Sequence, residues 1–98
     1  MFVNIIKSYR DVVAICDEEL IGKKFEEGNF QLDVKESFFK GEMTEEEKAI
    51  EIMKDMRLED ATFNIVGERS IALAIKSGII KEENVRKISG IPFALKLL

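Results

Sequence analysis

The chain of 98 residues contains no histidine, no tryptophan, one proline and one cysteine. Without histidine it lacks the one side chain whose ordinary pKa lies between pH 5 and 8, so proton transfer would need a strongly shifted carboxyl, lysine or thiol. A lone cysteine, Cys16, excludes a disulfide within the chain and is typical of a reducing compartment. We therefore expect a cytoplasmic protein stabilised mainly by its hydrophobic core.

Long hydrophobic runs are also missing. No apolar run approaches the roughly 20 residues that cross a bilayer, and Lys7 interrupts the apolar start before the core of a signal peptide is complete. Apolar residues make up 46% of the chain and charged residues 35%, a balance that favours a folded domain over a disordered segment. We expect one domain over residues 1–98 and no membrane partner.

Charge of one sign is concentrated in a single segment. The net charge is −4, and residues 42–60 hold eight acids and three bases. An acidic chain is poorly suited to neutralising phosphates, so non-specific DNA binding is not expected.

Local patterns predict strands at both ends of the first third of the chain. Two β-rich runs, 2–9 and 12–16, predict an N-terminal hairpin, and the second is apolar throughout, as a strand covered on both faces would be. Asp17 is a candidate N-cap for a single helical turn that Gly22 ends. Residues 30–34 alternate apolar and polar after a Glu-Gly-Asn turn signal, which predicts a half-buried strand.

Two main helices follow. Thr44 and Glu47 have the spacing of a capping box, and a helix over 45–58 would place its apolar side chains on one face. Residues 62–66 predict a strand, and Gly67 opens a second helix that is apolar nearly all round over 71–75. Residues 88–98 are extended, and Pro92 favours a sheet edge. The expected fold is therefore α+β: a small mixed sheet with an N-terminal hairpin, two main helices packed on it and a C-terminal edge strand.

No catalytic or metal-binding residues stand out. Cys16 precedes a helix start, which favours a thiolate, but three acids follow it directly and disfavour one, so we interpret it as a buried structural cysteine. Glu45, Glu46 and Glu47 point about 100° apart on a helix and cannot converge on one ion. We predict no metal and no cofactor.

The segment Asn64–Ser70 is the strongest candidate site. A strand, Gly67 and a helix start would present backbone N–H groups to an anion, which Arg69 would clamp beside Asn64 and Ser70. The alternative is structural: Gly67 makes a tight turn, Asn64 bonds nearby backbone, and Arg69 pairs with an acid.

Other surface features point to partners. Lys23 and Lys24, with other bases (Arg86, Lys87, Lys96) and an aromatic such as Tyr9 or Phe39, would make a small RNA-contacting face if they clustered, and are otherwise ordinary solvated side chains. Phe38-Phe39 and the tail 93–98 are more apolar than a loop and an edge usually require. They pack either on the domain's own core or in an interface with a second copy or another partner.

Five strings follow one another along the chain: residues 15–25 (ICDEELIGKKF), 27–28 (EG), 38–41 (FFKG), 61–70 (ATFNIVGERS) and 90–94 (GIPFA). Their order and spacing resemble the archaeal domain-of-unknown-function 424 family over nearly the whole chain. The resemblance implies a small cytoplasmic archaeal protein without an established activity. A histidine commonly follows the C-terminal proline in that family, whereas this chain has Phe93, so no role for that imidazole carries over.

Two functional hypotheses follow. The first is a non-enzymatic binding or adaptor domain for a protein or an RNA, with an association with the translation machinery as one form of it. Its contact surface would be Lys23-Lys24, the 64–70 turn and the C-terminal edge. The second is an enzyme or small-ligand binder that holds an anion at the Gly67 helix start with Arg69.

Overall fold

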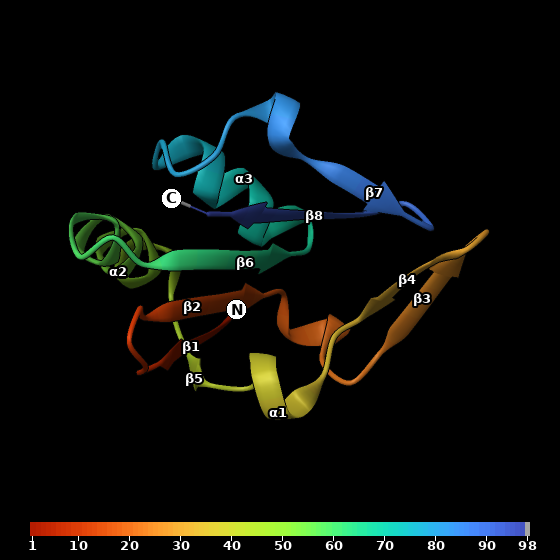
Figure 1. Ribbon diagram of the computed structural model, residues 1–98, viewed down its shortest axis with the longest axis horizontal. Helices are drawn as coiled ribbons and strands as arrows, with labels where there is room; N and C mark the ends of the chain where they lie inside the picture. Colours follow the sequence, from red (N-terminus) through yellow and green to blue (C-terminus); the bar gives the residue numbers. More distant parts are fainter. Residues whose placement is uncertain (98) are drawn as a thin grey trace.

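The structure, a computed structural model, describes residues 1–97, so Leu98 of the predicted C-terminal segment lies outside the described residues. Six strands form one mixed sheet in the order β5-β1-β2-β6-β8-β7 (Figure 1). Only β2 and β6 are parallel; every other neighbouring pair is antiparallel. The strands are β1 (Phe2–Ile6), β2 (Val12–Cys16), β5 (Glu42–Met43), β6 (Thr62–Val66), β7 (Arg86–Ile88) and β8 (Ile91–Lys96). The α+β class and the N-terminal hairpin are confirmed.

The central strand β2 is covered on both faces, as its uninterrupted apolar sequence predicts. Val13 and Ile15 belong to the core cluster on the helix side of the sheet, whereas Ala14 and Cys16 belong to a second cluster on the opposite face. All four side chains are fully buried. Alternation along an extended strand explains the division, because successive side chains point to opposite faces.

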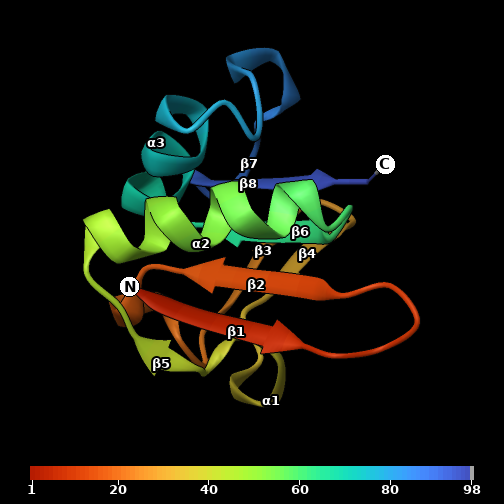
Figure 2. The same ribbon diagram turned by 90° about the vertical axis from the view of Figure 1, so that its left-hand side faces the viewer.

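Helices α2 (Glu46–Leu58) and α3 (Glu68–Lys76) cover one face of the sheet, and Figure 2 shows α2 in front of the sheet, running along its strands. The buried side of α2 is its predicted apolar side, with Ala49, Met53 and Met56 in the core. The predicted capping box is wrong: the N-cap is Glu45, and the Thr44 hydroxyl donates to the carbonyl of Glu42 (2.9 Å) instead. Within residues 1–97, no helix is long and apolar enough to cross a membrane.

Shorter elements cover the opposite face. These are the 3-10 turn η1 (Glu18–Leu20), the helix α1 (Glu36–Phe39), and a separate two-stranded sheet of β3 (Lys24–Glu27) and β4 (Phe30–Asp33). Phe39 is buried and Phe38 half-buried, with ring centroids 5.0 Å apart in an edge-to-face arrangement. The Phe pair therefore packs on the domain's own core.

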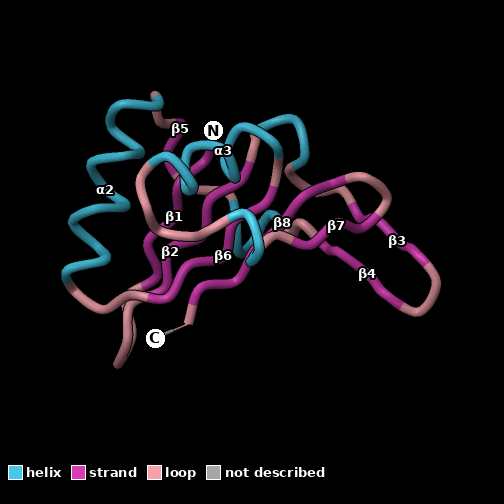
Figure 3. The backbone as a smooth tube through the Cα atoms, turned by 90° about the horizontal axis from the view of Figure 1, so that it is seen from above, coloured by secondary structure: helices cyan, strands magenta, loops and turns pink. Residues whose placement is uncertain are grey.

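The β3–β4 hairpin projects away from the main sheet, as Figures 1 and 3 show. Phe30, next to its tip, is 71% exposed. The turn between β7 and β8 holds the hairpin, because Ser89 donates its N–H to Oε1 of Glu27 (2.8 Å) and its hydroxyl to the carbonyl of Glu26 (2.7 Å).

The C-terminal strand β8 is not at the edge. It lies between β6 and the three-residue strand β7, which follows the 3-10 turn η2 (Glu82–Asn84) and forms the edge itself. Pro92 is tolerated there because it pairs with Lys87 at a position that needs no proline N–H. On its other side Pro92 lies past the end of β6, where its carbonyl accepts the N–H of Gly67 (2.9 Å). The prediction that the strand with Pro92 lies at the sheet edge is therefore wrong, because the missing N–H of Pro92 interrupts neither ladder.

Candidate functional site

The parallel pairing of β2 with β6 builds the site. Cys16 and Val66 are opposite each other at the ends of these strands, so the following residues, Asp17 and Gly67, lie side by side. The Asp17 N–H donates to the carbonyl of Val66 (3.1 Å). Chain segments fifty residues apart in the sequence thus meet where α3 begins.

The side chain of Asp17 caps the N-terminus of α3. Its carboxylate accepts the N–H of Arg69 (3.1 Å), the N–H of Ser70 (2.8 Å) and the hydroxyl of Ser70 (2.7 Å). Only 4% of Asp17 is exposed, and Ser70 is completely buried. Asp17 was predicted to cap the turn that follows it, but that turn has no side-chain cap bond. Its carboxylate instead stabilises the first turn of α3.

Gly67 permits this close approach. Its φ is +110° and its ψ 153°, a region that side-chain-bearing residues rarely adopt. A Cβ atom added there would lie within 2.7 Å of either oxygen of the Asp17 carboxylate. The glycine is therefore required both by its own backbone conformation and by its neighbour.

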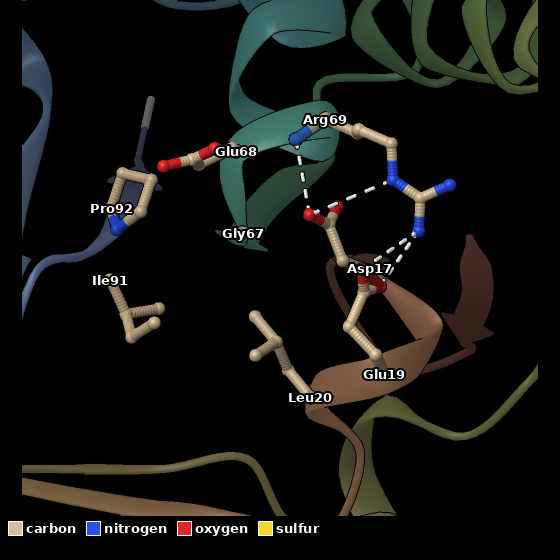
Figure 4. A pocket seen from close by; sticks show the side chains of 8 residues that line it. All are labelled: Asp17, Glu19, Leu20, Gly67, Glu68, Arg69, Ile91 and Pro92. Carbon is tan, nitrogen blue, oxygen red and sulfur yellow. Dashed lines mark hydrogen bonds and ion pairs between the residues drawn. The ribbon is translucent and has the colours of Figure 1, made fainter.

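Arg69 turns toward the acids of η1 (Figure 4). Its Nη2 lies 2.8 Å from Oε1 of Glu18 and 2.7 Å from Oε1 of Glu19, and its Nε lies 4.0 Å from Asp17. The pKa of Glu18 is lowered to about 2. The main cause is a hydrogen bond to its carboxylate from the backbone N–H of Glu18 itself, and the second is the amino group of Met1, 3.0 Å away. The pKa of Glu19 is lowered chiefly by its own backbone N–H, with help from Arg69. These carboxylates are ionised at neutral pH.

Two adjoining hollows flank the start of α3. The first, of about 310 Å³, lies between η1, α3 and β8 and has Leu20 and Ile91 on its apolar side (Figure 4). The second, of about 490 Å³, lies along α3 beside η2 and β7, with Ala72, Ile75 and Val85 in its lining. Glu68 and Pro92 line both. We call the pair the α3 groove.

The structure brings only some of the predicted site residues together. Gly67, Arg69 and Ser70 surround Asp17. Asn64 is half-buried on the other face of the sheet, where it shares a row with Ala14 and Leu95.

The basic residues do not form one face. Lys23 and Lys24 are exposed at the base of the projecting hairpin and line none of the α3 groove. Lys87 lines the groove, whereas its neighbour Arg86 pairs with Phe93 and so points to the opposite side of the sheet. The proposed aromatic partners do not join them. Phe39 is buried, and Tyr9 belongs to the loop between β1 and β2, which Figure 1 shows on the side of the molecule away from the β3–β4 hairpin.

Cys16 is buried, as predicted. Burial, and secondarily the charge of Asp17, raise the pKa of its thiol to about 12. A thiol in this state is a poor nucleophile at neutral pH. Among residues 1–97, no group of three or more acidic or cysteine side chains is placed to hold a metal ion.

Sequence reasoning missed the central role of Asp17 and the pairing of Glu18 and Glu19 with Arg69. A signal for Asp17 did exist: one buried strand is followed directly by an acid and another by glycine and a helix. Recognising it required knowing that the two strands are parallel neighbours, which no local pattern shows.

These features define a class: a small α+β domain in which two strand ends and a helix start are joined by one buried carboxylate. The chain belongs to the family of proteins of unknown function DUF424, whose model matches residues 6–97. It is also similar to a crystal structure of an uncharacterized conserved protein from Methanopyrus kandleri, with a TM-score of 0.83 and 23% identity over 96% of this chain and 87% of that chain. This similarity shows the fold alone. A search of curated proteins finds no match.

Proposed function

We propose that this chain is a non-enzymatic binding domain of the archaeal cytoplasm that holds a segment of a partner protein in the α3 groove. One observation carries the proposal. Helix α3 buries Ile71, Leu73 and Ala74 in the domain's own core, but two other apolar residues of its central part are not fully covered. Ala72 is exposed and Ile75 half-buried, and both line the larger hollow. Exposed apolar surface beside a hollow is typical of protein interaction sites, so a partner would complete the burial of these two side chains.

The surroundings of Arg69 favour binding of a partner protein over binding of an anion. The backbone N–H groups that would hold an anion are already bonded to Asp17, and the guanidinium is shared between Glu18 and Glu19. An anion entering here would have to displace a buried carboxylate and face two ionised ones. Scattered lysines likewise favour a protein over an RNA partner, because RNA contact needs clustered positive charge.

Site-specific photocrosslinking tests the proposal. Benzoylphenylalanine would replace Ala72 in the groove and, as a matched control, Glu51 on the exposed side of α2. After irradiation in lysate of the source organism, we expect a discrete protein adduct from position 72 and none from position 51. Equal adducts at both positions, no adduct at position 72, or an adduct that ribonuclease removes would each overturn the proposal.

A titration with inorganic phosphate separates the proposal from anion binding. We expect the melting temperature of the wild-type protein to respond to phosphate no more than that of Arg69→Ala. A phosphate-dependent rise that Arg69→Ala abolishes would favour the anion-binding alternative instead.

A further inference from the structure

We infer that the segment received by the α3 groove is basic and apolar: it places a lysine or arginine beside Glu68 and Glu82, and an aliphatic side chain against α3. This inference rests on the proposed function and names the chemistry of the partner. It comes from the way charge and apolar surface are divided along the groove.

The apolar part of the groove is formed by three elements. Ala72 and Ile75 come from α3, Val85 follows η2, and Pro92 belongs to β8. Both hollows are open to solvent, so they would contact one side of a partner segment and not enclose it. An aliphatic side chain placed here would be removed from water against other aliphatic carbons, which contributes roughly 25 cal/mol per Å² of apolar surface.

The polar rim of the groove is predominantly negative. Three carboxylates and one guanidinium line the first hollow, and two carboxylates and one ammonium line the second. The guanidinium of Arg69 is already engaged with Glu18 and Glu19. Glu68 and Glu82 make no ion pair within residues 1–97.

Glu68 lies where the acidic rim of the groove adjoins its apolar lining. Figure 4 shows its carboxylate on the Pro92 side of Gly67, turned away from Asp17 and Arg69. It lines both hollows, and Glu82 lines the larger one. A cation next to Glu68 would therefore sit beside the apolar floor without disturbing the buried Asp17 contacts. A phosphate or carboxylate in the same place would be repelled.

Nuclear magnetic resonance titration with three short synthetic peptides of equal length tests this inference. One alternates lysine with leucine, the second lysine with serine, and the third glutamate with leucine. We expect the lysine–leucine peptide to shift the amide resonances of residues 68–75 and 85–87, the lysine–serine peptide to bind less tightly, and the glutamate–leucine peptide not to bind. Raising the salt concentration should weaken binding.

Charge variants locate the cation. Glu68→Gln and Glu82→Gln should each raise the Kd of the lysine–leucine peptide about 1.5- to 5-fold, the range of an exposed ion pair. Glu51→Gln removes the same charge from the exposed side of α2 and should leave the Kd unchanged. This control is demanding, because residues 42–60 hold the greatest excess of acid in the chain.

The outcomes separate this inference from the proposed function. Shifts centred on α2, equal binding of the glutamate–leucine peptide, or an unchanged Kd in both groove variants would show that the partner is not basic and apolar. If a protein is crosslinked from position 72 while the basic peptide fails, the binding function stands and only the inferred chemistry is wrong. If both fail, both are wrong.

Discussion

Asp17 and Ser70 are buried residues joined by two hydrogen bonds, and they connect the end of β2 to the start of α3. The Ser70 N–H and hydroxyl both donate to the same carboxylate oxygen, at 2.8 and 2.7 Å. The N-cap residue of α3 itself, Gly67, makes no side-chain cap bond. The pair therefore couples the first third of the chain to the last third.

Replacing Asp17 should destabilise the fold severely. Asp17→Ala leaves the part-buried N–H of Arg69 and the buried N–H and hydroxyl of Ser70 without a partner, which costs about 2–4 kcal/mol by comparison with lost caps and unsatisfied groups. The melting temperature should fall by about 10–20 °C. Ser70→Ala removes only the hydroxyl bond and should cost about 1 kcal/mol. Thermal and urea unfolding followed by circular dichroism measure both.

The control for this prediction is Asp55→Ala, an aspartate on the exposed side of α2. Its effect should stay within about 0.5 kcal/mol. If Asp17→Ala proved as stable as Asp55→Ala, the carboxylate would not be the cap of α3.

Gly67→Ala should be more damaging than the same change at another glycine with positive φ. The new Cβ would overlap the Asp17 carboxylate in a conformation that alanine rarely adopts, at a cost of about 2–4 kcal/mol. Gly28→Ala, at φ +60° with no atom within 4 Å of the added carbon, should cost about 1 kcal/mol. Urea unfolding compares the two variants.

A double-mutant cycle identifies the cause at Gly67. In the Asp17→Ala background the alanine has no carboxylate to overlap, so its cost should fall by about 1 kcal/mol or more. Strictly additive costs would mean that backbone strain alone, and not the contact with Asp17, requires the glycine.

Local patterns in the sequence were sufficient for the elements that form the main core. The alternation and apolar runs of β1, β2 and β6, and the apolar side of α2, depend only on residues close together in the chain, so each was predictable. The short elements were not. The two residues of β5 and the four residues of α1 carry too little periodicity to be distinguished from loop.

The candidate site was predictable only in part, because its contacts are between distant segments. Gly67, Arg69 and Ser70 were recognised from the strand-glycine-helix pattern, but the group they surround comes from residue 17. Asn64 was placed with them by sequence proximity alone. In a strand, however, a side chain an odd number of positions away can point to the other face, and Asn64 does.

Cys16 should be inert toward alkylating reagents in the folded protein. With its pKa raised to about 12 and its side chain fully buried, native protein at pH 8 should not react with iodoacetamide on the timescale in which urea-unfolded protein reacts completely. Mass spectrometry counts the modified thiol. Modification of the native protein at the unfolded rate would contradict the burial of Cys16.

The same thiol should make stability depend on alkaline pH. Its pKa rises from 9.0 to about 12 on folding, so folding retains a proton that the unfolded chain loses. The stabilisation from this proton is complete below pH 9.0 and decreases as the pH rises toward 12. The loss approaches about 1.4 kcal/mol per pH unit within that window. Urea unfolding between pH 8 and 11 should show a shallower decline for Cys16→Ala, and parallel curves would contradict the assignment.

The projecting hairpin should be released by a change at Glu27. Its carboxylate accepts the N–H of Ser89, so Glu27→Ala removes one of two bonds that hold β3 and β4 against the β7–β8 turn. Amide hydrogens of residues 24–33 should then exchange faster, while the melting temperature falls by only about 4–8 °C, because the lost bond is exposed and contributes about 1 kcal/mol. Glu27→Gln keeps an oxygen acceptor and should restore most of the protection. If exchange in the hairpin were the same in all three proteins, Ser89 would not be what holds it.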